Sequence, residues 1–303
     1  MTLQVGDLIP IGGSGNVKKS EVLEGKTYSS DEGVELVGEM PNRGNLNKTI
    51  LLDDYKGLEG KQTVLNVAKG YYTGGKIEVE KLPDDTSGSP GNKVIKVGYK
   101  GEGYFGVVPA SELITGSALT SRVGVTEGTA QHSNTPWHKF SWKGKVLFIA
   151  QKTIRHSISW DHLNSKNLIY GGKTIEINGV KYKVRLVKGA LTDPSKYSDS
   201  DLGAKGSEWN RLVAPLSVQR KNNSWSYTAY MESDLQDWGT YISDSELTVR
   251  TADGRFTWCQ EVGGDGSANR VFRGYLGVSY SGTRTSSDTN SNNGWRPVLE
   301  VVE

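Results

Sequence analysis

A tryptophan-rich stretch near the middle of the chain reads Trp137-His138-Lys139-Phe140-Ser141-Trp142-Lys143-Gly144-Lys145-Val146-Leu147-Phe148-Ile149-Ala150. Lys143-Gly144 favours a turn, because glycine adopts the positive φ angles that tight turns need. The stretch therefore predicts two β-strands joined by a turn. The second strand is nearly all apolar, which is typical of a strand in the centre of a sheet.

Tryptophan is distributed unevenly along the chain. All eight tryptophans lie between Trp137 and Trp295, whereas residues 1–116 contain none and are rich in glycine. Large aromatic side chains bury the most apolar area per residue, so the globular core is expected after about residue 136. Residues 117–136 are small and polar without periodicity, which is typical of a linker. We therefore predict a glycine-rich region over 1–116, a linker over 117–136 and a globular domain over 137–303.

Short alternating segments lie between the glycines of the first region. Lys76–Glu80 and Lys93–Val97 alternate apolar with charged residues, which predicts half-buried strands. Each such strand has one thin apolar face, so strands from other copies of the chain would be needed to cover it.

Further elements are expected in the globular domain. Asn178-Gly179 predicts a hairpin turn between strands over 174–178 and 181–187. Short helices are expected at 157–163 and 207–213, where serines can cap the first turn. The fold class is therefore mainly β: an extended glycine-rich β shaft, followed by a mixed, mostly β globular domain with one or two short helices.

Two pieces of the first region carry a family resemblance. Residues 22–44 read Val-Leu-Glu-Gly-Lys-Thr-Tyr-Ser-Ser-Asp-Glu-Gly-Val-Glu-Leu-Val-Gly-Glu-Met-Pro-Asn-Arg-Gly, and residues 70–76 read Gly-Tyr-Tyr-Thr-Gly-Gly-Lys. This order resembles a repeat of tail-fibre and minor structural proteins of Gram-positive phages and prophages. The glycines and Asn42-Arg43-Gly44 also serve as turn residues, which is compatible with that resemblance. The resemblance implies a fibre.

Four later motifs carry a second resemblance: Ser207–Leu212, Trp258–Glu261, Arg270–Gly274 and Gly294–Glu300. Their order resembles the C-terminal domains of phage fibre proteins and, more distantly, the C-type-lectin-like fold. Enzymes with a similar fold use a cysteine pair for copper, but Cys259 is the only cysteine here. The Glu-Pro-Asn and Gln-Pro-Asp loops of calcium-dependent lectins are also missing from the sequence. We therefore expect the fold without the metal.

The lectin-like resemblance implies a ligand surface on the polar segment 278–293. Its aromatic and hydrogen-bonding side chains suit a hydroxyl-rich ligand such as a sugar, and the alternative is a solvated loop. A second aromatic cluster, Trp225–Tyr230, is expected to pack its Trp225 face in the core, with Tyr230 outward. Arg273 and Arg296 are expected to pair with buried backbone or carboxylates. The predicted ligand-binding residues are Tyr280, Arg284, Asp288, Asn290, Asn292 and Tyr230.

Charge and cysteine content argue against several function classes. The net charge is +2 with no run of Lys and Arg, so nucleic acid is not expected as a partner. No apolar segment reaches a membrane span and no signal peptide is recognisable, so neither membrane insertion nor secretion by a leader is expected. Cys259 lies in an alternating apolar stretch and is expected to be a small buried hydrophobe.

No pattern of catalytic or metal-binding residues stands out. Acidic residues are plentiful, but no spacing pairs two of them on one element for glycoside hydrolysis. The sequence has no Gly-x-Ser-x-Gly motif, and His156 and His162 lack a metal-ligand spacing. We therefore predict no enzymatic activity, no metal and no cofactor.

These observations favour a receptor-binding protein located in the virion tail or baseplate and made in the host cytoplasm. Its expected partners are a bacterial surface glycan and other virion proteins, and the chain is expected to form a homo-oligomer, with a trimer favoured. Two alternatives stay open. One is a structural tail or baseplate component without a host ligand, and the other is a depolymerase of surface polysaccharide.

Overall fold

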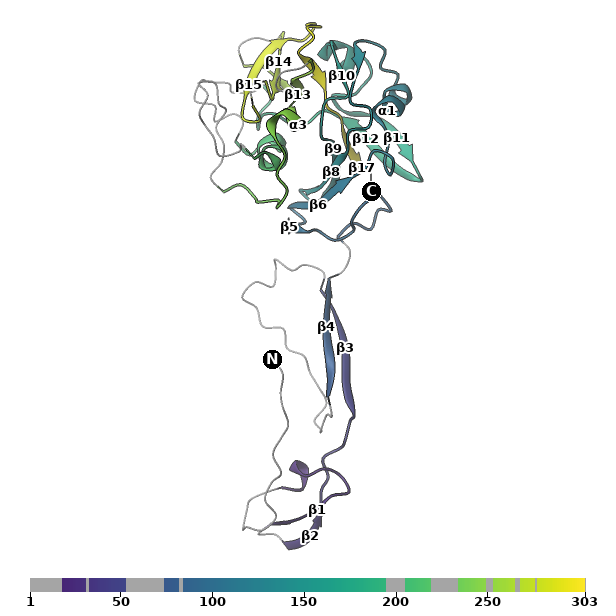
Figure 1. Ribbon diagram of the computed structural model, residues 1–303, viewed down its shortest axis with the longest axis vertical. Coiled ribbons are helices and arrows are strands. Elements are labelled where there is room, and N and C mark those ends of the chain that lie inside the picture. Colours follow the sequence, from purple (N-terminus) through teal and green to yellow (C-terminus); the bar gives the residue numbers. More distant parts are fainter. Residues whose placement is uncertain are drawn as a thin grey trace. The chain divides into compact units, whose positions relative to one another are not determined.

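The computed structural model describes residues 18–30, 33–52, 74–81, 84–194, 205–218, 234–248, 253–264, 268–275 and 277–302. The fold is mainly β, as the sequence predicts, with a few short helices. The chain divides into two compact units, Met1–Leu82 and Pro83–Glu303 (Figure 1).

The first unit contains two separate pairs of strands. Strands β1 (Thr27–Ser30) and β2 (Gly33–Val37) are antiparallel, while β3 (Asn45–Leu52) and β4 (Gly74–Lys81) are parallel and in register over their full length. Before β1 lies a short 3₁₀ turn, Lys19–Glu21. The strand predicted at Lys76–Glu80 is confirmed, because it lies within β4.

The two ends of the fibre-like repeat pair with each other. The amide of Met40 donates to the carbonyl of Val22 at 2.7 Å, and the amide of Gly38 donates to the carbonyl of Lys26 at 2.8 Å. A Cβ at position 38 would collide with the carbonyl oxygen of Leu23. Only glycine fits this close backbone approach, which explains why the repeat carries glycine there.

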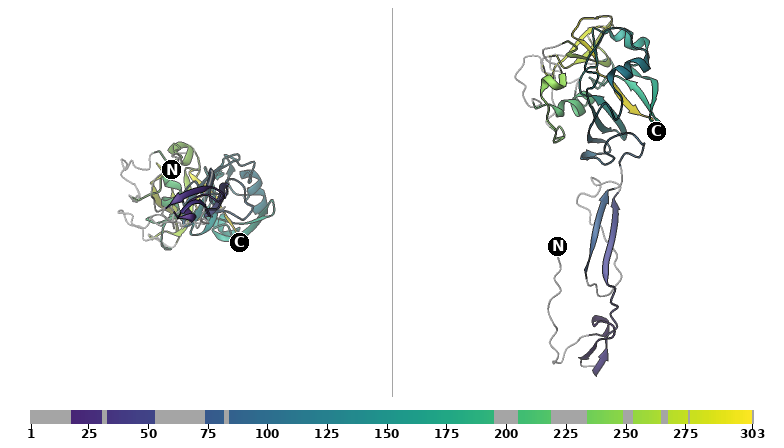
Figure 2. Two further views of the ribbon diagram at one scale, coloured as in Figure 1. Left: turned by 90° about the horizontal axis from the view of Figure 1, so that it is seen from below. Right: turned by 45° about the vertical axis from the view of Figure 1, so that its right-hand side comes forward.

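The larger sheet of the second unit has seven antiparallel strands in the order β11-β12-β17-β9-β8-β6-β5 (Figure 1). The predicted turn at Lys143-Gly144 joins β8 to β9, and Asn178-Gly179 joins β11 to β12; all four residues have positive φ. Figure 2 shows the yellow β17 among the teal strands of this sheet, where it separates β12 from β9. The prediction of a central, apolar β9 is confirmed. The strands are β5 (Val97–Tyr99), β6 (Glu102–Val108), β8 (Trp137–Trp142), β9 (Lys145–Ala150), β11 (Tyr170–Ile177), β12 (Val180–Arg185) and β17 (Val298–Val301).

The second sheet has six strands in the order β15-β14-β13-β16-β10-β7. Only β13 and β16 are parallel neighbours. The strands are β7 (Thr129–Ala130), β10 (Arg155–His156), β13 (Phe256–Val262), β14 (Asn269–Arg273), β15 (Ser281–Thr285) and β16 (Asn293–Trp295).

Short helices connect the sheets, and two of them were predicted. Helix α2 (Trp160–Ser165) begins after Ser159, whose hydroxyl accepts from the amide of His162 at 3.1 Å. A wide helical turn, Trp209–Val213, begins after Ser207, whose hydroxyl accepts from the amide of Asn210 at 3.2 Å, and a 3₁₀ turn, Ala214–Leu216, follows. The remaining helices are α1 (Gly116–Val123) and α3 (Asp244–Thr248). None of the helices in the described ranges is long and apolar enough to cross a membrane.

Tryptophan builds much of the core between the sheets. Trp137, Trp258 and Trp295 come from different strands of both sheets and are fully buried in one hydrophobic cluster. The indole of Trp137 donates to the carbonyl of Ile114, and that of Trp258 donates to the carbonyl of Ile158. Burying one such side chain contributes roughly 4–6 kcal/mol as an upper estimate from its area.

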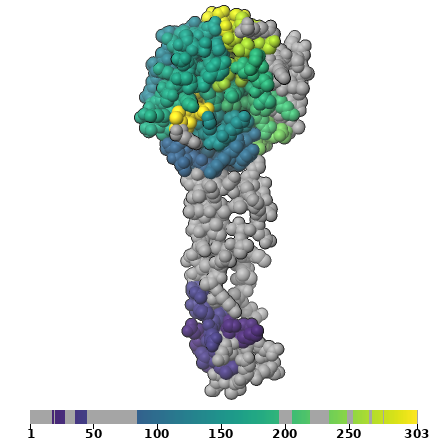
Figure 3. Space-filling view, turned by 180° about the vertical axis from the view of Figure 1, so that it is seen from behind, coloured from purple at the N-terminus to yellow at the C-terminus, as the bar shows by residue number. Residues whose placement is uncertain are grey.

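The unit boundary differs from the sequence prediction. The expected linker 117–136 contains most of α1, whose Leu119 and Val123 are buried in the core, and the second unit already begins at Pro83. Figure 3 shows the residues that follow Pro83, in blue, forming one surface with the teal residues of the same unit. The reason is that 84–116 lacks tryptophan but still contributes buried apolar side chains, among them Tyr104, Phe105 and Leu113.

One local expectation in this segment is wrong. The strand predicted at Lys93–Val97 is a loop up to Lys96, and only Val97 begins a strand. Gly103 of β6 permits a close approach of the backbone, since a Cβ there would lie 2.6 Å from the carbonyl oxygen of Tyr99. Glycine density therefore indicated a shaft where the chain in fact forms part of the core.

Candidate functional site

The segment 278–293, predicted to be the ligand surface, is partly a strand. Its residues 281–285 form β15, which pairs with β14. Tyr280 is half-buried at the start of β15 and stacks on Phe272, with 5.9 Å between ring centroids. Strand β15 therefore interrupts the predicted polar loop, and residues 278–280 and 286–292 of the segment lie outside the named strands.

The other predicted ligand residues in this segment bind each other. Nη1 of Arg284 lies 2.8 Å from Oδ2 of Asp288, and the guanidinium lies over the ring of Phe256. Oδ1 of Asp288 accepts from the amide of Asn290, and Oδ1 of Asn290 accepts from the amide of Asn292. These contacts shape the turn, and a ligand role for the four residues stays a prediction.

Two other residue predictions have different outcomes. Arg273 donates to the carbonyl of Gly189 at 3.1 Å, and Arg296 donates to the carbonyl of Ala150 at 3.2 Å, so both pair with buried backbone as expected. Cys259 is fully buried and burial raises the pKa of its thiol, which fits the expected small hydrophobe. Tyr230 lies outside the described residues.

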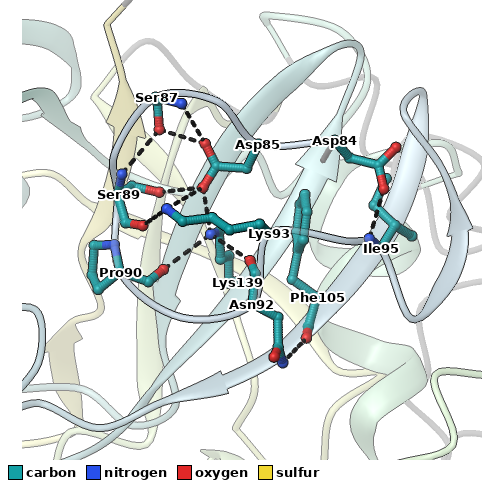
Figure 4. A network of polar contacts seen from close by, with 10 residues as sticks. All are labelled: Asp84, Asp85, Ser87, Ser89, Pro90, Asn92, Lys93, Ile95, Phe105 and Lys139. Atoms are coloured by element: carbon teal, nitrogen blue, oxygen red, sulfur yellow. Dashed lines mark hydrogen bonds and ion pairs between the residues drawn. The ribbon is translucent and has the colours of Figure 1, made fainter. Parts of the chain in front are cut away.

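A buried polar network surrounds Asp85 and Lys139 (Figure 4). Both side chains are fully buried, with 2.5 Å between Nζ and Oδ2. Nζ of Lys139 also donates to the carbonyl oxygens of Pro90 and Asn92 at 2.9 and 2.8 Å, which uses all three ammonium hydrogens. Lys93 makes a longer contact to the same carboxylate, at 3.4 Å.

The environment keeps Asp85 ionised. Burial alone would raise the pKa of this carboxyl, but hydrogen bonds from Lys139, Ser87 and Ser89 outweigh burial and hold the pKa well below its usual range. All three hydrogens of the Lys139 ammonium are engaged within the protein. The network is therefore suited to fixing residues 84–93 on β8 rather than to binding a ligand.

A pocket of about 450 Å³ opens over one face of the larger sheet. Strands β9, β11, β12 and β17 contribute to it, together with residues 188–191 and 206–208. Its lining combines cationic, acidic, aromatic and aliphatic side chains, so it differs from the saturated network around Lys139.

A chain of ion pairs forms the floor of this pocket. Arg185 is buried and binds Glu208 in a bidentate manner, with distances of 2.8 and 2.9 Å. Nε of Arg185 lies 2.8 Å from Oε2 of Glu300, and Nζ of Lys145 lies 2.8 Å from Oε1 of Glu300. The two acids are thereby compensated by two cations within the protein.

Three further lysines line the pocket without an acidic partner in the part of the chain that the structure describes. Lys143, Lys183 and Lys188 form no ion pair with any described residue, although Lys143 lies over the ring of Trp142 at 5.3 Å. Among the described residues that line it, five are cations (Lys143, Lys145, Lys183, Arg185 and Lys188) and two are acids (Glu208 and Glu300), a difference of +3. This described part of the lining therefore carries a net positive charge.

Exposed apolar side chains border the same pocket. Tyr170 is 57% exposed and Leu191 is 64% exposed, which is unusual for large hydrophobic residues in this protein. The hydroxyl of Tyr170 donates to the carbonyl of Gln260 at 3.2 Å, which fixes the ring. A fixed ring and an aliphatic side chain beside cations match the mixed lining of ligand sites.

The two acids of the pocket are poorly suited to acid–base catalysis. Burial would raise the pKa of Glu300, but hydrogen bonding to Lys145 and the charge of Arg185 outweigh it, so the pKa lies below its ordinary value. Glu208 is held by both Nη atoms of Arg185. A general acid needs a raised pKa and a free carboxyl group, so this arrangement favours binding over hydrolysis.

Comparisons with protein-family models, curated proteins and solved structures give no match. Among the residues that the structure describes, no group of three or more His, Cys, Asp or Glu is placed to hold a metal ion. The features that bear on function are therefore the residues of the pocket and the segments 22–44 and 70–76.

The sequence patterns do not predict this pocket. They indicate a turn at Lys143 and give Lys183 and Lys188 no special role. An available signal was the alternation in Val180-Lys181-Tyr182-Lys183-Val184, where buried apolar residues and lysines alternate along a strand. The alternation gives the face of the lysines, but not that residues 188–191 and 206–208 meet them there.

Proposed function

We propose that this chain is a receptor-binding protein of a phage or phage-tail-like particle and that its second unit attaches the particle to a glycan of the bacterial surface. The observation that carries the binding role is the pocket, where exposed Tyr170 and Leu191 border three lysines that pair with no acidic side chain among the described residues. The resemblance of residues 22–44 and 70–76 to a repeat of phage tail-fibre proteins supports the proposal that the chain belongs to such a particle.

The proposal describes binding without catalysis. Glu208 and Glu300 are engaged with Arg185 and Lys145, so neither is available as a nucleophile or general acid without breaking an ion pair. A depolymerase is therefore less well supported than a binding protein.

Assembly with other chains completes the proposal. The parallel pair β3–β4 contains two strands of eight residues each, and two strands alone are too few for an independently stable sheet. We propose that strands of further copies complete it in a homo-oligomer, with a trimer favoured, and that the first unit contacts other virion proteins in the tail or baseplate. Several weak sites on one oligomer would then give firm attachment.

The same pair of strands favours a second candidate function. A structural tail or baseplate component would need the assembling strands but no host ligand. The two functions differ in the role of the second unit, which binds a cell surface only in the first.

A binding experiment tests the proposed function. Labelled full-length protein is incubated with whole cells of a panel of Gram-positive bacteria and with cell walls purified from them. We expect saturable binding to at least one strain and to its walls, and competition by unlabelled protein. Absence of binding across a broad panel, with a protein that is shown to be folded, would support the structural component instead.

A further inference from the structure

We infer that the pocket over β9, β12 and β17 binds a negatively charged group of a glycan, a phosphate or a carboxylate carried on the sugar polymer. This inference deepens the proposed function, and it rests on that function for the assumption that the ligand is a glycan. The binding of the charged group itself depends on the residues that line the pocket.

The negative charges of the two acids in the pocket are compensated by cations of the protein. Glu208 and Glu300 would repel an anion if their charges were free, but Arg185 lies between them at 2.8 Å from each, and Lys145 contacts Glu300. The four side chains form a neutral floor. Among the described residues of the lining, the electrostatic field above the floor therefore comes from Lys143, Lys183 and Lys188.

The three remaining lysines lie around the same pocket. Lys183 is half-buried on β12, in the strand that also supplies Arg185, whereas Lys188 is exposed just beyond that strand. Both line the same pocket as Lys143, which follows β8. Three ammonium groups around a hollow of about 450 Å³ provide a site for an anion large enough to contact more than one of them.

The border of the pocket suits the uncharged part of a sugar ligand. Tyr170 and Leu191 offer apolar surface at the border of the pocket, and the backbone of β11 and β12 fixes the position of the ring. The carbon-bound hydrogens of a sugar ring suit this surface. A small inorganic anion would leave this apolar surface unused.

Charge-reversal variants test the inference. The double variant Lys183→Glu, Lys188→Glu is compared with the control Lys26→Glu, Lys166→Glu, which changes the net charge equally on lysines that do not line the pocket. A second pocket variant, Lys183→Gln with Lys188→Gln, guards against misfolding by repulsion. Circular dichroism and thermal unfolding establish that each variant is folded.

The probes are purified poly(glycerol phosphate), polygalacturonate and the neutral polymer dextran. We expect the wild type and the control to bind an anionic probe well above dextran, and both pocket variants to lose roughly tenfold or more in affinity. Binding should weaken between about 0.1 M and about 1 M salt, since the Debye length falls from about 10 Å to about 3 Å. Preference for one anionic probe identifies phosphate or carboxylate as the source of the charge.

Several outcomes would overturn the inference. One is that the wild type binds dextran as tightly as the anionic probes, and another is that the folded pocket variants keep the affinity of the wild type. A third is that the wild type binds duplex DNA as tightly as the anionic probes, which would indicate unspecific attraction of polyanions. Whole-cell binding separates the two proposals. If the wild type and the pocket variants bind cells equally, the receptor-binding function is supported and the anion site is rejected. If the wild type binds an anionic probe but no cells, the anion site is supported and the receptor-binding function is rejected.

Discussion

Glu261 is a carboxyl group in the core of the second unit, close to the pocket. Burial is the main cause that raises its pKa from 4.5 to about 8, and the nearby charges of Glu208 and Asp193 add to the effect. Oε2 of Glu261 accepts a hydrogen bond from the amide of Gly189 at 3.0 Å. The folded protein therefore binds a proton at this side chain under conditions in which the unfolded chain has released it.

The raised pKa predicts a loss of stability with rising pH. Below pH 4.5 the side chain is protonated in both states, and its contribution is fully present; between 4.5 and about 8 only the folded state holds the proton, so the contribution is lost as pH rises through that window. Glu261→Gln keeps the shape and an acceptor for Gly189 without the titration. We expect the thermal midpoint of the variant to exceed that of the wild type at pH 8 and to match it near pH 4. Parallel midpoint curves of the two proteins over this range would reject the explanation.

Single residues were predictable where local pattern determines their surroundings. Cys259 alternates with apolar neighbours, and Arg273 and Arg296 lie in strand motifs, so their burial could be expected. The ligand prediction for Arg284 and Asp288 did not anticipate their mutual ion pair, because a spacing of four residues in a turn does not show whether two charges face each other or solvent. The lysines of the pocket belong to separate elements, and only the fold brings them together.

At the scale of elements, the buried ion pair fastens the segment 84–93 to β8. Lys139→Met would leave Asp85 as an uncompensated buried charge, so we expect a loss of about 3–5 kcal/mol in the free energy of unfolding. Lys93→Met is the matched control, because Lys93 contacts the same carboxylate at 3.4 Å but its side chain is 39% exposed; its loss should be about 0–1 kcal/mol. Urea unfolding measures both values. Equal losses for the two variants would show that burial of the pair is not what stabilises this segment.

Hairpins were the elements best predicted from sequence. Lys143-Gly144 and Asn178-Gly179 carry their turn geometry in two residues, and both turns occur where expected. The loop at 93–96 was wrongly predicted as a strand since its alternating pattern matches a strand, while contacts with residues remote in sequence hold it as a loop. Ile95 shows this, because its amide donates to Oδ2 of Asp84 at 2.7 Å.

For the whole molecule, the division at Leu82–Pro83 predicts which part folds alone. A fragment of residues 83–303 contains every strand of the two larger sheets, whereas 137–303 lacks β5, β6, β7 and α1 together with core residues such as Tyr104 and Leu119. We expect the longer fragment to unfold cooperatively and the shorter fragment to lack a cooperative transition, as measured by calorimetry. A stable, cooperative 137–303 would instead support the boundary expected from the sequence.

The place of β17 in the larger sheet also bears on how the protein is made. Its residues Val298–Val301 pair with β9 on one side and with β12 on the other, although both hairpins are complete far earlier in the chain. During translation, β9 and β12 therefore each present an unpaired edge until Val301 has left the ribosome. The second unit must finish folding after nearly all of its residues have been synthesised, and a product that stops short of β17 leaves two open β-edges for chaperones or aggregation.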